Sequence, residues 1–114
     1  MDTQTALNAF AALAHDSRLS IIRLLIKAGP EGLSAGVIGQ HLNIMASALS
    51  FHLNYLAQCK LISAQHQGRR IIYAACFDIM TELIQFLSEN CCEGKECSLV
   101  DSSALIMCSQ EPRS

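Results

Sequence analysis

The apolar residues in the first part of the chain recur every three or four positions, a spacing that predicts amphipathic helices. A first helix is expected over residues 5–14. Asp16 is expected to cap a second helix, which ends at Gly29-Pro30. The inward face of that second helix is predicted to hold four apolar residues: Leu19, Ile22, Leu25 and Ile26.

Residues 34–58 predict two more helices separated by a tight turn. Ser34 is expected to cap the first of them, and Asn43 lies in the break between the two. Apolar spacing then resumes at Leu49, Leu53 and Leu56. At 100° per residue these three leucines face the core. The residues then expected to face outward are Ser47, Phe51, Asn54 and Gln58, with Ser50 and His52 on the flanks.

The pattern changes after Lys60 to two short β-prone runs, "LISAQH" and "RIIYAAC". They are joined across Gln67-Gly68-Arg69, which predicts a hairpin whose turn takes its positive φ from Gly68. A final helix is expected over residues 78–90, with more apolar residues than one narrow stripe requires. This surplus, together with Leu7 and Phe10 of the first helix, predicts a homodimer.

Two helices separated by a turn and followed by a β-hairpin describe a winged helix-turn-helix protein. In such proteins the second helix of the motif enters the DNA major groove and the hairpin flanks it. The expected fold is therefore mainly α with a small β-hairpin, and homodimeric. A chain of 114 residues fits one domain. We expect that domain over residues 1–97 and a flexible tail over residues 98–114.

The charge is distributed unevenly along the chain. Residues 1–76 hold six basic and three acidic residues, whereas residues 77–114 hold two basic and seven acidic residues. No Asp or Glu occurs from Gly32 to Phe77. A surface that approaches phosphate avoids carboxylates in this way, although chance in a weakly charged chain is the alternative.

The side chains expected to contact DNA lie on the outward side and the flanks of the fourth helix and at the hairpin turn: Ser47, Ser50, Phe51, His52, Asn54, Arg69 and Arg70. Phe51 suits a thymine methyl group, and the alternative is that it packs under the hairpin. His52, expected on the flank, suits a phosphate or a base better than a metal. The two arginines suit the minor groove or its phosphates, the alternative being a solvated basic turn.

No apolar run is long enough to span a membrane, and the first residues do not resemble a secretory signal. We therefore expect a cytoplasmic protein whose six cysteines are mostly free thiols. Cys59 and Cys76, in apolar stretches, are expected in the core. The other four are Cys91, Cys92, Cys97 and Cys108.

Three segments of the chain resemble the ArsR/SmtB family of metal-responsive repressors: "LAHDSRLSIIRLL", "ASALSFHLNYLAQCKLI" and "QGRRIIYAA". The resemblance covers most of residues 5–90. It implies a homodimer that binds a palindromic operator and releases it when a metal or metalloid binds. The family's S-x-H-L pattern falls on Ser50, His52 and Leu53. The cysteine pair of many arsenic sensors, before the recognition helix, and the last-helix Asp/His pattern of zinc sensors have no counterpart here.

The effector site is therefore expected in the cluster Cys91, Cys92 and Cys97. Soft thiolates select soft ions, and three sulfurs in a pyramid satisfy trivalent arsenic or antimony, whereas structural zinc takes four ligands. Some members of the family have a comparable C-terminal cluster for arsenite. The expected function is thus a repressor, not an enzyme, that is induced by trivalent arsenic or antimony and needs no organic cofactor.

Four alternatives to a metalloid-responsive repressor stay open. Zinc or another divalent ion would recruit Cys108 as a fourth sulfur, and a redox switch would form a disulfide through Cys97. A thiol oxidoreductase is disfavoured because the sequence has no C-x-x-C pair. A thiol buffer that does not bind DNA would use the helical body only for dimerisation. DNA binding in the metal-free state separates this buffer from a repressor.

Overall fold

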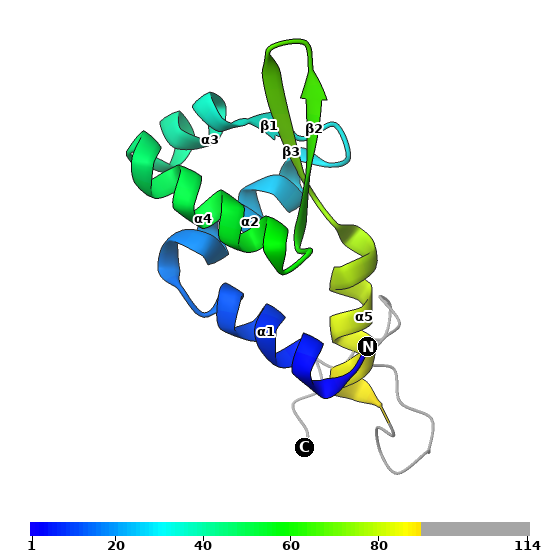
Figure 1. Cartoon of the computed structure of the whole chain (residues 1–114). Helices are drawn as coiled ribbons and strands as arrows, with labels where there is room; N and C mark the ends of the chain where they lie inside the picture. The colour runs from blue at the N-terminus through cyan, green and yellow to red at the C-terminus, as the bar shows by residue number, and fades with distance from the viewer. Residues whose placement is uncertain (90–114) are drawn as a thin grey trace, which may run out of the picture. The chain divides into compact units, whose positions relative to one another are not determined.

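The computed structural model describes residues 1–89 and has the element order of a winged helix-turn-helix (Figure 1). Met1–Met80 form one compact unit, and a second begins at Thr81, within the last helix. The helices and strands are α1 (Thr3–Leu13), α2 (Asp16–Ala28), β1 (Leu33–Ser34), α3 (Ala35–Leu42), α4 (Ala46–Gln58), β2 (Ile62–Gln67), β3 (Arg70–Ala75) and α5 (Phe77–Ser88). The prediction of a mainly helical chain with a β-hairpin is confirmed.

The first two helices begin at side-chain caps. The Asp2 carboxylate accepts a hydrogen bond from the backbone N–H of Thr5 at 3.1 Å. Hydrogen bonding to the side chain of Thr5, and then to its backbone, lowers the pKa of the Asp2 carboxyl. The expected cap of α2 is wrong by one residue, because His15 Nδ1 accepts from the backbone N–H of Ser17 at 3.1 Å. Asp16 is instead the first helical residue, where its negative charge favours the helix N-terminus.

The buried side of α2 is rotated from the predicted one. Its buried residues are Arg18, Ile21, Ile22 and Leu25, whereas Leu19 and Ile26 are exposed. Both sets have helical spacing, so the apolar pattern alone does not choose between them. Arg18 decides between them, because its buried side chain bonds Ala12 and His52 and so turns its side of α2 towards the core.

Helices α3 and α4 form the helix-turn-helix. Ser34 caps α3 as predicted, with its hydroxyl oxygen accepting from the backbone N–H of Val37 at 3.4 Å. Asn43 ends α3 in the left-handed conformation, with φ of 56°. The three leucines predicted to face inward from α4 are all buried: Leu49, Leu53 and Leu56. Their burial fixes which side of α4 remains on the surface.

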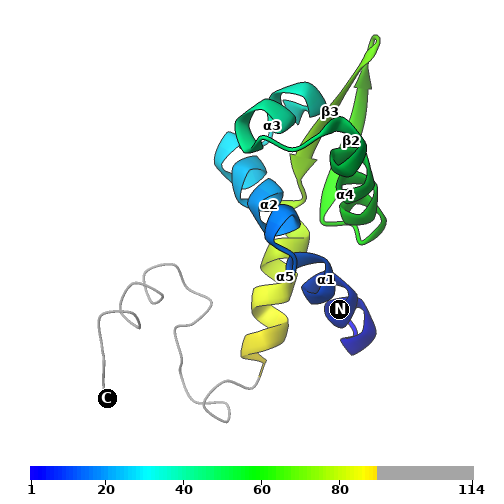
Figure 2. The same cartoon turned by 90° about the vertical axis from the view of Figure 1, so that its left-hand side faces the viewer.

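The wing is an antiparallel hairpin of β2 and β3, which extends beyond the helices beside α3 and α4 (Figures 1 and 2). Gly68 at its turn has φ of +66°, as predicted. The sequence prediction missed the third strand, β1, which pairs with the other side of β3. Gly32 precedes β1 with φ of +71°, and any side chain there would overlap the carbonyl oxygen of Tyr73.

Several large apolar side chains remain on the surface of the described chain. Leu7 of α1 is 54% exposed, and Leu87 of α5 is 66% exposed.

The prediction that Cys59 and Cys76 lie in the core is wrong, because both are half-buried. Within residues 1–89, no helix is long and apolar enough to cross a membrane. The cluster Cys91, Cys92 and Cys97, Cys108 and the predicted tail lie outside the described residues.

Candidate nucleic-acid interface

The outward side of α4 carries polar side chains and one aromatic ring. Its members, which we call the reading face, are Ser47, Ser50, Phe51, Asn54 and Gln58, and all five are exposed. Phe51 is 64% exposed, which contradicts the alternative that it packs under the hairpin. Phe51, Asn54 and Gln58 also line one open hollow on this helix. The predicted orientation of α4 is therefore confirmed for these residues.

His52 does not belong to the reading face. The sequence placed it on the flank of α4 as a DNA contact, but its side chain is only 9% exposed. Its Nδ1 lies 3.3 Å from Arg18 Nη1, and its ring centroid lies 4.8 Å from that of His15. Because Arg18 can only donate, Nδ1 of His52 accepts, so the ring is neutral with its proton on Nε2. His52 lies at the flank of α4, as predicted, but its side chain faces the core, so the prediction that it contacts DNA is wrong.

Arg18 joins the first, second and fourth helices in one cluster. Its Nε donates to the carbonyl oxygen of Ala12 at the end of α1, at 2.7 Å. Its guanidinium carbon lies 4.2 Å from the ring centroid of Tyr55 on α4, a cation–π distance. With the contact to His52, these bonds fix α4 against α1 and α2. No role for Arg18 was predicted from the sequence.

The wing and the recognition helix share a second hollow. We call it the wing hollow; it has a volume of about 460 Å³ and is lined by Ser34, Ala35, Gly36, Ser50, Arg69, Arg70, Ile71 and Tyr73. Ser50 of α4 and both predicted wing arginines thus face one space, although 19 positions separate Ser50 from Arg69. No carboxylate lines this hollow. Its charge suits a phosphate group.

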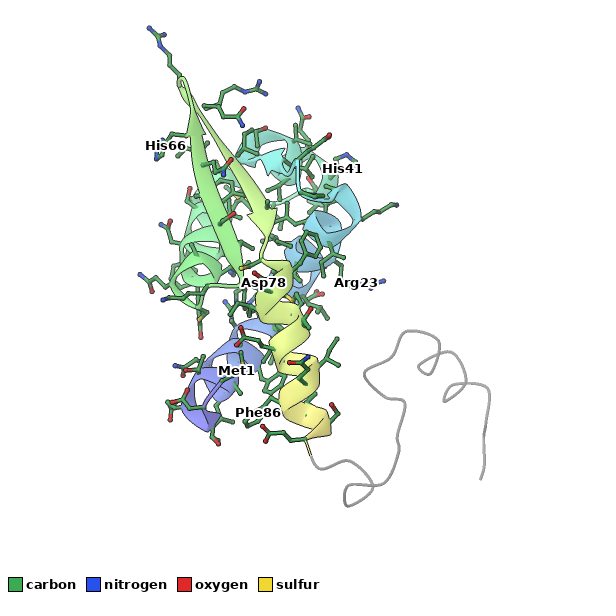
Figure 3. All side chains as sticks on the ribbon, turned by 90° about the vertical axis from the view of Figure 1, so that its right-hand side faces the viewer. Met1, Arg23, His41, His66, Asp78 and Phe86 are labelled. Atoms are coloured by element: carbon green, nitrogen blue, oxygen red, sulfur yellow. The ribbon has the colours of Figure 1, made fainter. Side chains whose placement is uncertain are left out.

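The histidines of the carboxylate-free segment are divided between surface and core. His41 on α3 and His66 on β2 are exposed and extend from the ribbon (Figure 3). His52 alone among the three is buried. The segment from Gly32 to Phe77 therefore presents polar and basic side chains, without an acidic one, across α3, α4 and the hairpin.

Comparison with known proteins identifies this architecture. A helix-turn-helix domain family matches residues 13–63. The transcriptional repressor SdpR of Bacillus subtilis (strain 168) is 34% identical over 80 residues, covering 70% of this chain and 86% of SdpR. An ArsR-like transcriptional regulator from Rhodococcus sp. RHA1 superposes with a TM-score of 0.70 at 25% identity over 96% of both chains. The chain belongs to the ArsR family of winged helix-turn-helix transcriptional regulators.

Another solved structure has a similar fold. NolR from Sinorhizobium fredii is 29% identical, with a TM-score of 0.61 over 75% of this chain and 83% of NolR. SdpR is a transcriptional repressor, and the Rhodococcus protein is an ArsR-like transcriptional regulator. In this ArsR-family chain, α4 is the recognition helix and β2–β3 is the wing.

The metal-ligating side chains of residues 1–89 are not clustered. No group of three or more His, Cys, Asp or Glu side chains in residues 1–89 could hold one. The Cys59 Sγ atom lies 3.8 Å from the carbonyl oxygen of Asn8, and burial raises the pKa of its thiol. A raised pKa keeps this thiol protonated, which disfavours it as a ligand.

One exposed residue beside the reading face was missed. Met45, which precedes the first residue of α4, is 76% exposed. In helix-turn-helix proteins the N-terminal residues of the recognition helix contact base edges, so Met45 is a further candidate for a DNA contact. A large apolar residue directly before the polar face was the signal available in the sequence.

The stability of this ArsR-family chain is expected to decrease below pH 6.5. Burial lowers the pKa of His52 from its ordinary value of 6.5, and the nearby His15 and Arg18 lower it further. Above pH 6.5, His52 is neutral in both the folded and the unfolded chain, so its contribution to stability is fully present. As the pH falls through 6.5 towards the lower folded pKa, the unfolded chain binds a proton first, so the contribution is lost.

The measurement is urea unfolding between pH 7.5 and 5.0. His52→Asn keeps an acceptor near the position of Nδ1 but cannot titrate, so it should reduce the slope of stability with pH. His41→Asn, at an exposed position, should leave that slope unchanged. If the stability of wild type and of His52→Asn depends on pH with the same slope, folding does not lower the pKa of His52 and the prediction is wrong.

Proposed function

We propose that this protein is a homodimeric repressor that binds a palindromic operator and releases it when trivalent arsenic or antimony binds. The observation that carries the DNA-binding part is the surface shared by α4 and the wing. It combines the uncharged reading face with Arg69 and Arg70, and the segment that forms it contains no carboxylate. Such a surface contacts base edges through its polar groups and phosphates through its arginines.

The proposal of a homodimer is supported by apolar residues that a monomer leaves in water. Leu7 on α1, and Ile84 and Leu87 on α5, are 54%, 44% and 66% exposed. A symmetric dimer buries the same patch of both subunits. Two recognition helices then contact half-sites about 34 Å apart, so a small change in their separation weakens contacts in both half-sites.

The proposed inducer rests on the chemistry of Cys91, Cys92 and Cys97, which follow α5 in the sequence. Three thiolates within seven residues suit a trivalent metalloid, which completes its shell with three sulfurs. The described residues offer no competing cluster of ligands. Coupling between the two sites is reciprocal, so operator DNA must weaken metalloid binding by the factor by which metalloid weakens DNA binding.

The test is fluorescence anisotropy of reduced, metal-free protein on DNA from its own promoter, followed by arsenite, antimonite and zinc in turn. We expect tight binding without metal and release by arsenite or antimonite. Cys97→Ser removes one of three sulfurs and is expected to abolish most of the response. Cys59→Ser, which alters a half-buried thiol beside Asn8, is the matched control and should keep it.

Each other outcome selects an alternative. Release by zinc alone would indicate a four-sulfur site that includes Cys108. Full arsenite response in Cys97→Ser would contradict the three-sulfur site. Equal metalloid affinity with and without operator would contradict the coupling. Absence of DNA binding in every condition would favour a thiol buffer over a repressor.

A further inference from the structure

Helix α4 has a composition that restricts which bases it reads. Its sequence, "ASALSFHLNYLAQ", contains no Asp, Glu, Lys or Arg. Arg or Lys to guanine is the commonest specific contact in the major groove, and Asp or Glu reads the amino group of cytosine. Neither type of contact is available from this helix. Side chains that favour G·C pairs through charge are therefore absent from its reading face.

The exposed side chains that remain favour A·T pairs. Phe51 presents an apolar ring at 64% exposure, and only thymine carries a methyl group in the major groove. Asn54 and Gln58 have amide groups of the kind that bond N6 and N7 of adenine together. Ser47 and Ser50 accept either pair, so they do not oppose this preference.

The three discriminating side chains are also neighbours on one stripe. Phe51, Asn54 and Gln58 line the same open hollow. Residues 51 and 54 are three positions apart, and at 1.5 Å per residue they differ by about 4.5 Å along the helix axis. This difference is close to the rise of about 3.4 Å between base pairs. One half-site can therefore meet both side chains at neighbouring pairs.

The ring of Phe51 is held in place from the core side. It lies edge-on to the ring of His52, with centroids 5.6 Å apart and planes inclined at 66°. His52 is in turn held by Arg18 at 3.3 Å and lies against His15. A side chain that is positioned before binding loses less entropy on contact with its partner. His52 is thus a positioning residue for Phe51 and does not itself reach the DNA.

We propose that Phe51 and Asn54 select neighbouring A·T base pairs in each operator half-site, Phe51 through a thymine methyl group and Asn54 through an adenine edge. The inference rests on the proposed DNA binding, but it is independent of the inducer. It assigns specificity to two side chains of α4 and leaves phosphate anchoring to the wing.

The first experiment is selection of binding sites from random-sequence duplex DNA by the reduced full-length protein. The second measures affinity for the selected site after each thymine of a half-site is replaced by deoxyuridine, which removes the methyl group alone. Wild type should lose about three- to five-fold in affinity at one position. Phe51→Ala should bind more weakly at the start and lose nothing further there.

The matching test for Asn54 replaces adenine with 7-deazaadenine, which removes the acceptor N7. Asn54→Ala is expected to bind roughly 10-fold more weakly and to become insensitive to that replacement. Thymine replaced outside the selected half-sites is the DNA control. Both residues are exposed, so thermal unfolding of each variant should match that of wild type.

The outcomes separate this inference from the proposed function. Half-sites that lack A·T pairs at common positions, or equal losses on deoxyuridine in wild type and Phe51→Ala, would overturn the base assignment while DNA binding stands. No bound sequence in the selection would overturn both. Two results together support the assignment. Deoxyuridine at one thymine should lower the affinity of wild type but not that of Phe51→Ala, and 7-deazaadenine at a neighbouring adenine should lower the affinity of wild type but not that of Asn54→Ala.

Discussion

Replacing Arg18 with methionine is expected to lower the free energy of unfolding by about 3 kcal/mol, because two hydrogen bonds from a charged group are lost in a buried position. Arg18 is 8% exposed, and its Nε donates to the Ala12 carbonyl oxygen at 2.7 Å. That oxygen is among the last four of α1, which have no partner within the helix. Methionine replaces the stem of Arg18 but leaves this oxygen unpaired.

The same substitution affects the recognition helix. Arg18 Nη1 bonds His52 at 3.3 Å, and its guanidinium lies over Tyr55, so both contacts to α4 disappear together. His52 Nδ1 then loses its donor in the core. Since the ring of Phe51 rests edge-on against that of His52, Arg18→Met should also weaken operator binding at temperatures where the variant is folded.

Arg23→Met is the matched control because Arg23 lies on the same helix but is exposed (Figure 3). Its effect is expected within about 0.5 kcal/mol. Urea unfolding at one fixed protein concentration measures both variants, since dimerisation makes stability depend on concentration. Equal stability of the two variants would show that the Arg18 cluster adds little to the fold.

The sequence was sufficient to predict the elements whose pattern is local. Leu49, Leu53 and Leu56 have the spacing of one helix face, so both the existence of α4 and its outward side follow from them. Gly68 lies between two β-prone runs, so the hairpin turn and its positive φ also follow from neighbouring residues. Strand β1 was missed because two residues are too few to show a period of two.

The position of His52 was not predictable in this way. At 100° per residue it lies 60° from Leu49, on the border between inside and outside. What draws it inward is Arg18, 34 positions earlier in the chain. The apolar periodicity of a helix gives no information on the contacts that another helix provides. A polar residue on the border is buried when a residue of another helix offers it a hydrogen-bond partner. The same contact explains why Arg18, and not Leu19, faces the core on α2.

Neutralising the wing is expected to weaken operator binding more than any single change on the reading face. Arg69 and Arg70 are exposed and line the wing hollow with Ser50. In a dimer the double variant Arg69→Gln/Arg70→Gln removes four cations from the DNA surface. If each cation neutralises one phosphate, affinity at 0.15 M salt should fall roughly 100- to 1000-fold through lost counterion release.

The dependence on salt distinguishes a phosphate contact from a solvated turn. Removing four phosphate contacts should reduce the slope of log affinity against log salt by about 3.6. Phosphate contacts carry no sequence information, so the loss should be similar on operator and on unrelated DNA. An equal loss of slope on both DNAs, with selected half-sites unchanged, would place the two arginines on the backbone.

Arg23→Gln, which removes one cation from α2 of each subunit, controls for the general charge of the protein, and its slope should stay close to that of wild type. If the double variant keeps its affinity and slope, the arginines form a solvated turn and α4 alone holds the operator. If it loses affinity only on A·T-rich sites, the arginines instead enter a narrow minor groove, whose negative potential attracts arginine. Wing and recognition helix would then read the same base pairs from different grooves.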